Sequence, residues 1–220
     1  EICNATEYKR AEADFIAFLA ETKGKKAAEK ASQAEHLVRI EALKQLAVQG
    51  KIKQAIQWIR DFLDTNGQKL VVFGVHKTVV DALMKEFASE AVKVDGSVSA
   101  TKRDEAVVAF QEDPNVKLFV GNIQAAGTGL TLTAASAVAF LELPWTPGEL
   151  AQAADRCHRI GQKDTVNVYY LLADNTIEME IAQLLDEKKA VLNAVLDGKE
   201  VEETQLLEVL IKKYKERRES

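Results

Sequence analysis

Short apolar segments alternate with amphipathic segments from residue 69 to residue 171, and this alternation constrains the fold more than any other feature of the sequence. Segments that are apolar throughout are typical of strands buried on both sides of a parallel sheet. Amphipathic segments between them are typical of helices that cover such a sheet. The pattern predicts strands over 69–73, 91–94, 117–120, 136–141 and 166–171, and helices over 76–89 and 101–111. The expected fold class is therefore α/β, a parallel sheet with helices on both faces.

Further helices are expected on both sides of this α/β region. Residues 4–64 contain no proline and have helical apolar spacing, so two or three helices are expected there. The basic segment 22–30 interrupts them, either as a solvated turn or as a loop that contacts phosphate. Beyond the sheet we expect a helix over 176–196, ended by Gly198, and a last helix over 202–218 with a basic end. The predicted domains are 1–66, an N-terminal helical protrusion and linker; 67–198, the α/β domain; and 199–220, a C-terminal helix.

Composition limits the partners of the chain. The net charge is −5 and the pI about 5.4, so phosphate contacts must come from local patches, not from the overall charge. Of the two cysteines, Cys157 is expected on a buried helix face, which argues against a disulfide with Cys3 and for a reducing compartment. No metal-ligand spacing is present, and we expect no metal site. The chain begins with Glu1 and shows no signal peptide, so we expect a piece of a longer protein that works inside the cell. The expected place is the cytoplasm or nucleoid of a prokaryote, or the nucleus of a eukaryote.

Residues 118–141 carry no charge and are long enough to span a bilayer. Polar side chains and the Gly127-Thr128-Gly129 loop interrupt the segment, and each buried polar group would need a partner in lipid. Two buried strands around a polar loop explain the segment better, so no membrane contact is expected. The loop also lacks the third glycine of a dinucleotide-binding fingerprint, which excludes that kind of site.

The strongest local signal is the start of a helix after the strand predicted over 136–141. Thr146 can cap the helix, and Pro147 suits its first position. Glu149 stands three residues after the cap, where its side chain can reach back to it. A capped helix is therefore expected to begin here.

Helical spacing would place Gln152, Arg156 and Arg159 together on the exposed face of this helix. The residues expected to face inward are Leu150, Ala153, Ala154, Cys157 and Ile160. Two guanidiniums one turn apart could bind an anion, although they could also form weak surface ion pairs with Asp155 or Glu149.

The segment QAADRCHRIGQ, residues 152–162, resembles motif VI of the superfamily 2 helicase-like ATPases, in the QxxDRxHRxGQ form of Swi/Snf-type DNA translocases. In that family the arginines that match Arg156 and Arg159 are catalytic arginine fingers on the γ-phosphate of ATP bound to the partner lobe. A planar guanidinium that is always charged suits the charge spread over a transferring phosphoryl group. Gln152 and Gln162 match the flanking glutamines of the motif.

The resemblance extends upstream and covers about residues 68–197. The segment 121–140, GNIQAAGTGLTLTAASAVAF, resembles motif V of the same family. The segments 69–83 and 93–110 are similar to the first strand and the DNA-backbone-contacting segment of its second lobe. The resemblance implies that residues 67–198 form a RecA-like second helicase lobe. Within the family, the short motifs of this sequence are most similar to those of the annealing-helicase branch.

Loops after the predicted strands, starting at Gly74, Asp95, Gly121 and Pro144, should meet at one edge of the sheet. The resemblance implies DNA contacts from residues in or near these loops, namely His76, Lys77, Gly96, Ser97, Arg103, Thr128 and Trp145. It implies nucleotide contacts from Gly127, Gly129, Gln152, Arg156 and Arg159. Structural alternatives stay open, with His76 as an ordinary histidine, Ser97 as part of a simple turn and Trp145 as a packing lid over the sheet.

The sequence contains no phosphate-binding P-loop, because none of its Gly-Lys pairs is followed by Ser or Thr. It also lacks a DExH-like acidic motif for magnesium. We therefore expect that this chain does not hydrolyse ATP alone, and that ATP and Mg²⁺ are bound mainly by a first lobe. The leading hypothesis is the second motor lobe of a Swi/Snf-type ATP-dependent DNA translocase, with double-stranded DNA and the N-terminal RecA-like lobe of the same protein as partners.

Two alternatives come from other classes. The chain could be a non-catalytic module that binds DNA or protein without ATP, which a first lobe with a P-loop in the same protein would exclude. It could also be an RNA helicase lobe, which the RIGQ ending and the Trp145 loop disfavour.

Overall fold

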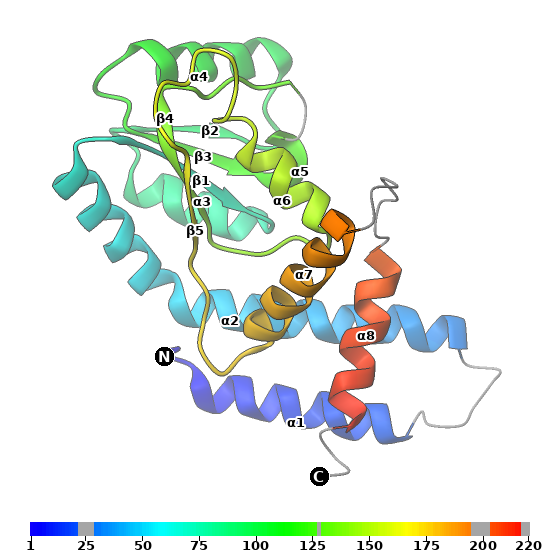
Figure 1. Ribbon diagram of the computed structural model, residues 1–220. Coiled ribbons are helices and arrows are strands. Elements are labelled where there is room, and N and C mark those ends of the chain that lie inside the picture. Colours follow the sequence, from blue (N-terminus) through cyan, green and yellow to red (C-terminus); the bar gives the residue numbers. More distant parts are fainter. Residues whose placement is uncertain (22–28, 127–128, 195–202, 217–220) are drawn as a thin grey trace. The chain divides into compact units, whose positions relative to one another are not determined.

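A computed structural model of the chain describes residues 1–21, 29–126, 129–194 and 203–216 (Figure 1). The chain divides into two compact units. Glu1–Lys51 and Ala173–Ser220 form one, called here the helical unit, and Ile52–Leu172 form the other, the sheet unit.

The sheet unit is built on five parallel strands in the order β2-β3-β1-β4-β5. The strands are β1 (Lys69–Gly74), β2 (Ala91–Val94), β3 (Leu118–Asn122), β4 (Ala135–Phe140) and β5 (Asn167–Tyr170). The central strand β1 is buried after its first residue, because its apolar run LVVF has neighbours on both faces. The α/β class and the parallel sheet predicted from the sequence are confirmed.

Helices cover both faces of this sheet, as predicted. The helices of the unit are α3 (Lys77–Glu86), α4 (Ala100–Glu112), α5 (Ile123–Ala126) and α6 (Pro147–Ala154). Figure 1 shows α3 on one side of the strands and α4 on the other. On the α4 side, Phe110 packs with Phe73 and Phe119 in a core to which α5 and α6 also contribute. On the opposite side, α3 buries Val80 and Leu83.

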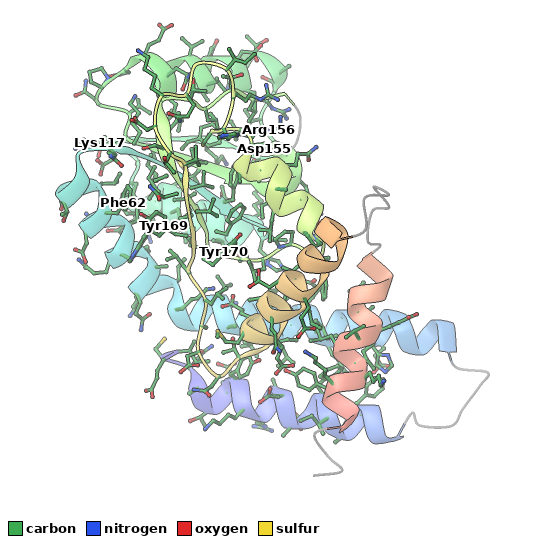
Figure 2. The ribbon with its side chains drawn as sticks, in the orientation of Figure 1. Phe62, Lys117, Asp155, Arg156, Tyr169 and Tyr170 are labelled. Atoms are coloured by element: carbon green, nitrogen blue, oxygen red, sulfur yellow. The ribbon has the colours of Figure 1, made fainter. Side chains whose placement is uncertain are left out.

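The helix α2 (Glu29–Asn66) contributes residues to both units, with Lys51 the last residue of one and Ile52 the first of the other. In the sheet unit the centre of its Phe62 ring lies 5.8 Å from that of Tyr169 in β5 (Figure 2). The centre of the Trp58 ring lies 5.2 Å from that of the same tyrosine. This aromatic cluster covers part of an edge strand that is otherwise largely exposed. Trp58, expected in the core, is half-buried.

The helical unit contains α1 (Ala5–Glu21), the first part of α2, α7 (Ile177–Ala194) and α8 (Glu203–Glu216). Buried polar contacts join these helices: the backbone N–H of Ile177 donates to the Tyr8 hydroxyl at 2.6 Å, and the Lys51 ammonium lies 2.5 Å from the Glu178 carboxylate. Burial raises the pKa of Tyr8 well above its usual value, so its hydroxyl stays protonated. The two helices of the N-terminal segment fall within the two or three predicted, whereas most of the basic segment 22–30 lies outside the described residues.

The two units break at different positions from the predicted domain boundaries, which remain a proposal. The chain crosses between units at Lys51 and Ile52, and again at Leu172 and Ala173. The difference arises because α7 packs with the other helices, through the contacts of Ile177 and Glu178, rather than belonging to the sheet.

Neither cysteine is in a disulfide, and Cys157 is buried as predicted. Among the described residues, no helix is long and apolar enough to cross a membrane. The charge-free segment 118–141 instead supplies β3 and β4, with Gly127 and Thr128 between them outside the described residues.

Gly121 in β3 gives a test of the packing. A methyl group added there would lie 2.9 Å from Cε1 of Phe73 and 3.1 Å from Cε1 of Phe119. Both rings are fully buried, so Gly121→Ala is expected to lower the free energy of unfolding by about 1–3 kcal/mol in urea denaturation. Gly96→Ala, whose methyl would meet nothing within 4 Å, is the control and should change it by less than about 0.5 kcal/mol. Equal effects of the two substitutions would contradict this packing.

Candidate functional site

Loops at the carboxyl edge of the sheet are tied together by hydrogen bonds. Glu142, two residues after β4, accepts from the backbone N–H of Val75 at 2.7 Å and of His76 at 2.8 Å. The side chain of Asn122, at the end of β3, donates to the Val75 carbonyl. The loops after β1, β3 and β4 therefore meet at one edge, as predicted.

Glu142 also binds the His76 ring, whose Nδ1 lies 2.5 Å from Oε1. Burial alone would raise the pKa of Glu142, but the hydrogen bonds from His76 and Val75 outweigh burial and hold it below its usual value. The residue is thus a buried carboxylate that orients His76 and the start of α3. Sequence reasoning missed it, although a glutamate directly after a buried strand, in LELPW, is a detectable signal.

The predicted turn Asp95-Gly96-Ser97 follows β2. Asp95 Oδ1 accepts from the Ser97 backbone N–H at 2.9 Å and from its hydroxyl at 2.5 Å, while Lys93 Nζ lies 3.0 Å from Oδ2. Burial acts to raise the pKa of Asp95, but the bonds from Ser97 and Lys93 outweigh it and lower the pKa to about 2. The carboxylate fixes the turn and leaves Gly96 exposed at its outer point.

The helix α6 begins as predicted. The Thr146 hydroxyl accepts from the backbone N–H of Glu149 at 3.3 Å and donates to its carboxylate at 3.1 Å. With Pro147 at the first position, the cap predicted from the sequence is confirmed.

The end of this helix differs from the prediction. α6 stops at Ala154, so a single exposed helix face that carries Gln152, Arg156 and Arg159 does not form. Arg156 is buried, whereas Ile160, expected to face inward, is fully exposed. After Ala154 the chain tightens into i→i+3 bonds, in which the backbone N–H of Arg156 donates to Ala153 and that of Cys157 to Ala154. The Arg156 carbonyl then accepts from the backbone N–H of Leu132 at 2.8 Å, outside the helix.

Arg156 and Arg159 stand three positions apart in the turn after α6. Burial lowers the pKa of Arg156, and the nearby charge of Arg159 lowers it further, with Asp155 acting in the opposite direction. Arg156 and Asp155 lie just beyond α6 (Figure 2). The exposed Arg159 donates weakly from Nη1 to the Gly129 carbonyl and the Thr131 hydroxyl, each at 3.4 Å. Two neighbouring cations, one buried and one exposed, favour an anionic ligand.

An open hollow lies beside Arg159. It is lined by Thr131, Ala154, Asp155, His158, Arg159, Ile160, Gln162, Lys163, Asp164, Thr165, Val166 and Val168. Within the described ranges, no group of three or more His, Cys, Asp or Glu side chains could hold a metal ion. Arg159 and Lys163 bring positive charge to the lining, and Asp155 and Asp164 bring negative charge.

The remaining predicted site residues are distributed over the same unit. Gln152 and Lys77 are exposed, Arg103 is half-buried on α4, and Gly129 is exposed with φ of 73°. Trp145 is buried, at 9% exposure, as the packing alternative expects, so its DNA contact stays a prediction. Gly127 and Thr128 lie outside the described residues.

Residues 50–161 match the family described as helicase conserved C-terminal domain. The chain belongs to this family. Over 157 residues, 70% of its length, it is 39% identical to the human DNA annealing helicase and endonuclease ZRANB3. It is 38% identical over 147 residues to the Xenopus tropicalis SWI/SNF-related matrix-associated actin-dependent regulator of chromatin subfamily A-like protein 1. The chain spans only 14% and 16% of these two relatives.

Solved structures agree with this assignment. The Sulfolobus solfataricus SWI2/SNF2 ATPase core in complex with double-stranded DNA matches 85% of this chain with a TM-score of 0.67 and 28% identity, over 42% of its own length. The C-terminal part of the Fun30 ATPase domain matches 76% with a TM-score of 0.62 and 26% identity, over 54% of its own length. The chain is therefore a RecA-like C-terminal helicase lobe of the Swi/Snf type, and this prediction is confirmed.

Asp95 gives a pH-dependent test of the turn after β2. Because its pKa in the folded lobe, about 2, is below the ordinary value of 3.8, its stabilisation is present above about pH 4 and is lost as the pH falls toward 2. Asp95→Asn should lower the free energy of unfolding by about 1–2 kcal/mol at pH 7, and the difference from wild type should shrink at pH 3. Urea denaturation at both pH values measures this, with the exposed Asp64→Asn as control. A difference that is unchanged at pH 3 would contradict the assignment.

Proposed function

We propose that the chain is the second motor lobe of a Swi/Snf-type ATP-dependent double-stranded-DNA translocase, and that Arg156 and Arg159 act on the γ-phosphate of ATP bound by a first lobe. The observation that carries the proposal is the place of Arg156 and Arg159 in the QAADRCHRIGQ segment, three positions apart just beyond α6, with Arg159 beside Gly129 and Thr131. Charged guanidiniums are strong donors to phosphate oxygens.

The two arginines differ in a way that supports separate roles. Arg156 is buried, and its backbone is fixed by the bond from Leu132. Arg159 is exposed, and its 3.4 Å contacts with Gly129 and Thr131 are long enough to be exchanged for stronger bonds to phosphate oxygens. We assign the transition-state contact chiefly to Arg159 and a fixed, supporting charge to Arg156. Gln152, Gly127 and Gly129 belong to the same proposed nucleotide cleft.

The carboxyl edge of the sheet forms the proposed DNA surface. His76 and Lys77 stand at the start of α3, where Glu142 holds the loop, and Gly96 and Ser97 stand at the turn that Asp95 fixes. Arg103, Thr128 and Trp145 complete the proposed set. The similar Sulfolobus ATPase core was solved in complex with double-stranded DNA, which supports the same ligand here. Closure of the two lobes on ATP and their opening after hydrolysis would move this edge along DNA.

The other expectations follow from this role. ATP and Mg²⁺ would be bound mainly by the first lobe, and the chain alone would not turn over ATP. Double-stranded DNA and the first lobe are the proposed partners. The proposed location is the cytoplasm or nucleoid of a prokaryote, or the nucleus of a eukaryote.

Removal of the exposed arginine tests the catalytic role. In a protein that joins this lobe to its first lobe, Arg159→Ala should lower DNA-stimulated ATP turnover by roughly 10³-fold, because the positive charge that stabilises the transferring phosphoryl group is lost. Arg159→Lys should recover little, since an ammonium lacks the planar fork. Arg156→Ala should lower turnover and also the free energy of unfolding, because the side chain is buried. Unchanged turnover in Arg159→Ala would leave a DNA- or protein-binding module as the better explanation.

The DNA surface is tested by the salt dependence of binding. Lys77 begins α3 at the proposed DNA edge, whereas Lys85 lies in the last turn of the same helix. Lys77→Ala should weaken duplex binding and reduce the slope of log affinity against log salt by about one. Lys85→Ala is the matched control and should leave the slope unchanged. A slope that changes equally in both variants would argue against this edge.

A further inference from the structure

The turn that carries Arg159 is shaped by the side chain of Gln162. Its Nε2 donates to the carbonyls of Ala135 at 2.7 Å, Cys157 at 3.2 Å and Thr133 at 3.3 Å. These carbonyls belong to the start of β4, the turn before it and the chain just after α6. One amide therefore joins the Arg159 turn to the sheet.

The other half of the same amide closes the turn from the opposite side. Oε1 accepts from the backbone N–H of Lys163 at 2.9 Å and of Asp164 at 3.0 Å. The backbone N–H of Gln162 donates to the Arg159 carbonyl at 3.0 Å. Donors face the Oε1 end, and at the Nε2 end two N–H groups are shared among three carbonyls, so an amide in this one orientation matches both ends.

The two residues before Gln162 add no buried apolar side chain to this turn. Ile160 is fully exposed, and Gly161 adopts φ of 106°, a conformation that lets the chain reverse without a side chain. The hydrogen bonds of Gln162 tie this turn to the start of β4, and with the bond from Leu132 to the Arg156 carbonyl they fix the point from which the Arg159 side chain starts.

We propose that Gln162 is a positioning residue, which sets the place of the Arg159 guanidinium next to Gly129 and Thr131. The proposal rests on the function proposed above, because it takes the nucleotide as the ligand of Arg159. A phosphoryl transition state requires a guanidinium at a defined place, and a displacement of about 1 Å can cost on the order of 10²-fold in rate. Gln162 acts through Arg159 and needs no contact with the nucleotide.

Substitutions at Gln162 separate its donors from its acceptor. Gln162→Glu keeps the shape and the acceptor but sets a carboxylate against three carbonyls, and Gln162→Asn keeps the amide but is too short to reach them. In the two-lobe protein both should lower the kcat of DNA-stimulated ATP hydrolysis by on the order of 10- to 100-fold, with KM for ATP changed by less than about 3-fold. The exposed Gln54→Glu on α2 is the control.

A double-mutant cycle shows whether Gln162 acts through Arg159. If it does, Gln162→Asn should lower kcat by less than about 3-fold in an Arg159→Ala background. The proposal would be overturned if the kcat loss of the double variant equalled the product of the losses in Gln162→Asn and Arg159→Ala. It would also be overturned if both Gln162 variants kept their kcat while Arg159→Ala was severely impaired. An Arg159→Ala protein with normal turnover would instead overturn the proposed function, and this inference with it.

Circular dichroism melting of each variant identifies losses of kcat that come only from unfolding. A kcat loss in the Gln162 variants that matches their unfolded fraction would also overturn the positioning role of Gln162.

Discussion

A buried carboxylate, Glu142, stands just after β4 and organises the carboxyl edge of this lobe. Glu142 is 2% exposed, and it remains ionised because the loop after β1 supplies two backbone N–H groups and an imidazole ring. A buried charge without such donors would be strongly destabilising. The positions of His76 and of the first turn of α3 therefore depend on a residue at the end of β4, and the proposed DNA edge depends on the same contact.

A second set of polar contacts performs the same task on the nucleotide side. Leu132 and Gln162 bond to the carbonyls of Arg156 and Cys157, just beyond the end of α6, and hold the turn that follows the helix. The turn puts one guanidinium in a buried position and the next in an exposed one. In our account the buried charge supports the site and the exposed charge moves onto phosphate, so the early end of the helix is a functional feature.

Local signals allowed most of the fold to be predicted. The strand β1 could be predicted because LVVF is apolar throughout. The start of α6 could be predicted because Thr146, Pro147 and Glu149 stand within four positions of one another. The turn after α6 was not predictable from periodicity, because the bonds that hold it come from Leu132 and Gln162, which lie outside the helix. Glu142 was missed for a similar reason, since its partners stand 66 and 67 positions away. The family resemblance predicts a role for Arg156 and Arg159, and the structure adds that their environments differ, one buried and one exposed.

The central claim is that Arg159 stabilises the transferring phosphoryl group rather than bound nucleotide in general. The most direct measurement is the affinity of the two-lobe protein, with DNA, for ADP alone and for ADP with aluminium fluoride, which together imitate the transition state. The account predicts that Arg159→Ala weakens binding of the aluminium fluoride complex by on the order of 10²-fold or more and leaves ADP binding nearly unchanged. Equal losses for both ligands, or no loss for either, would contradict it.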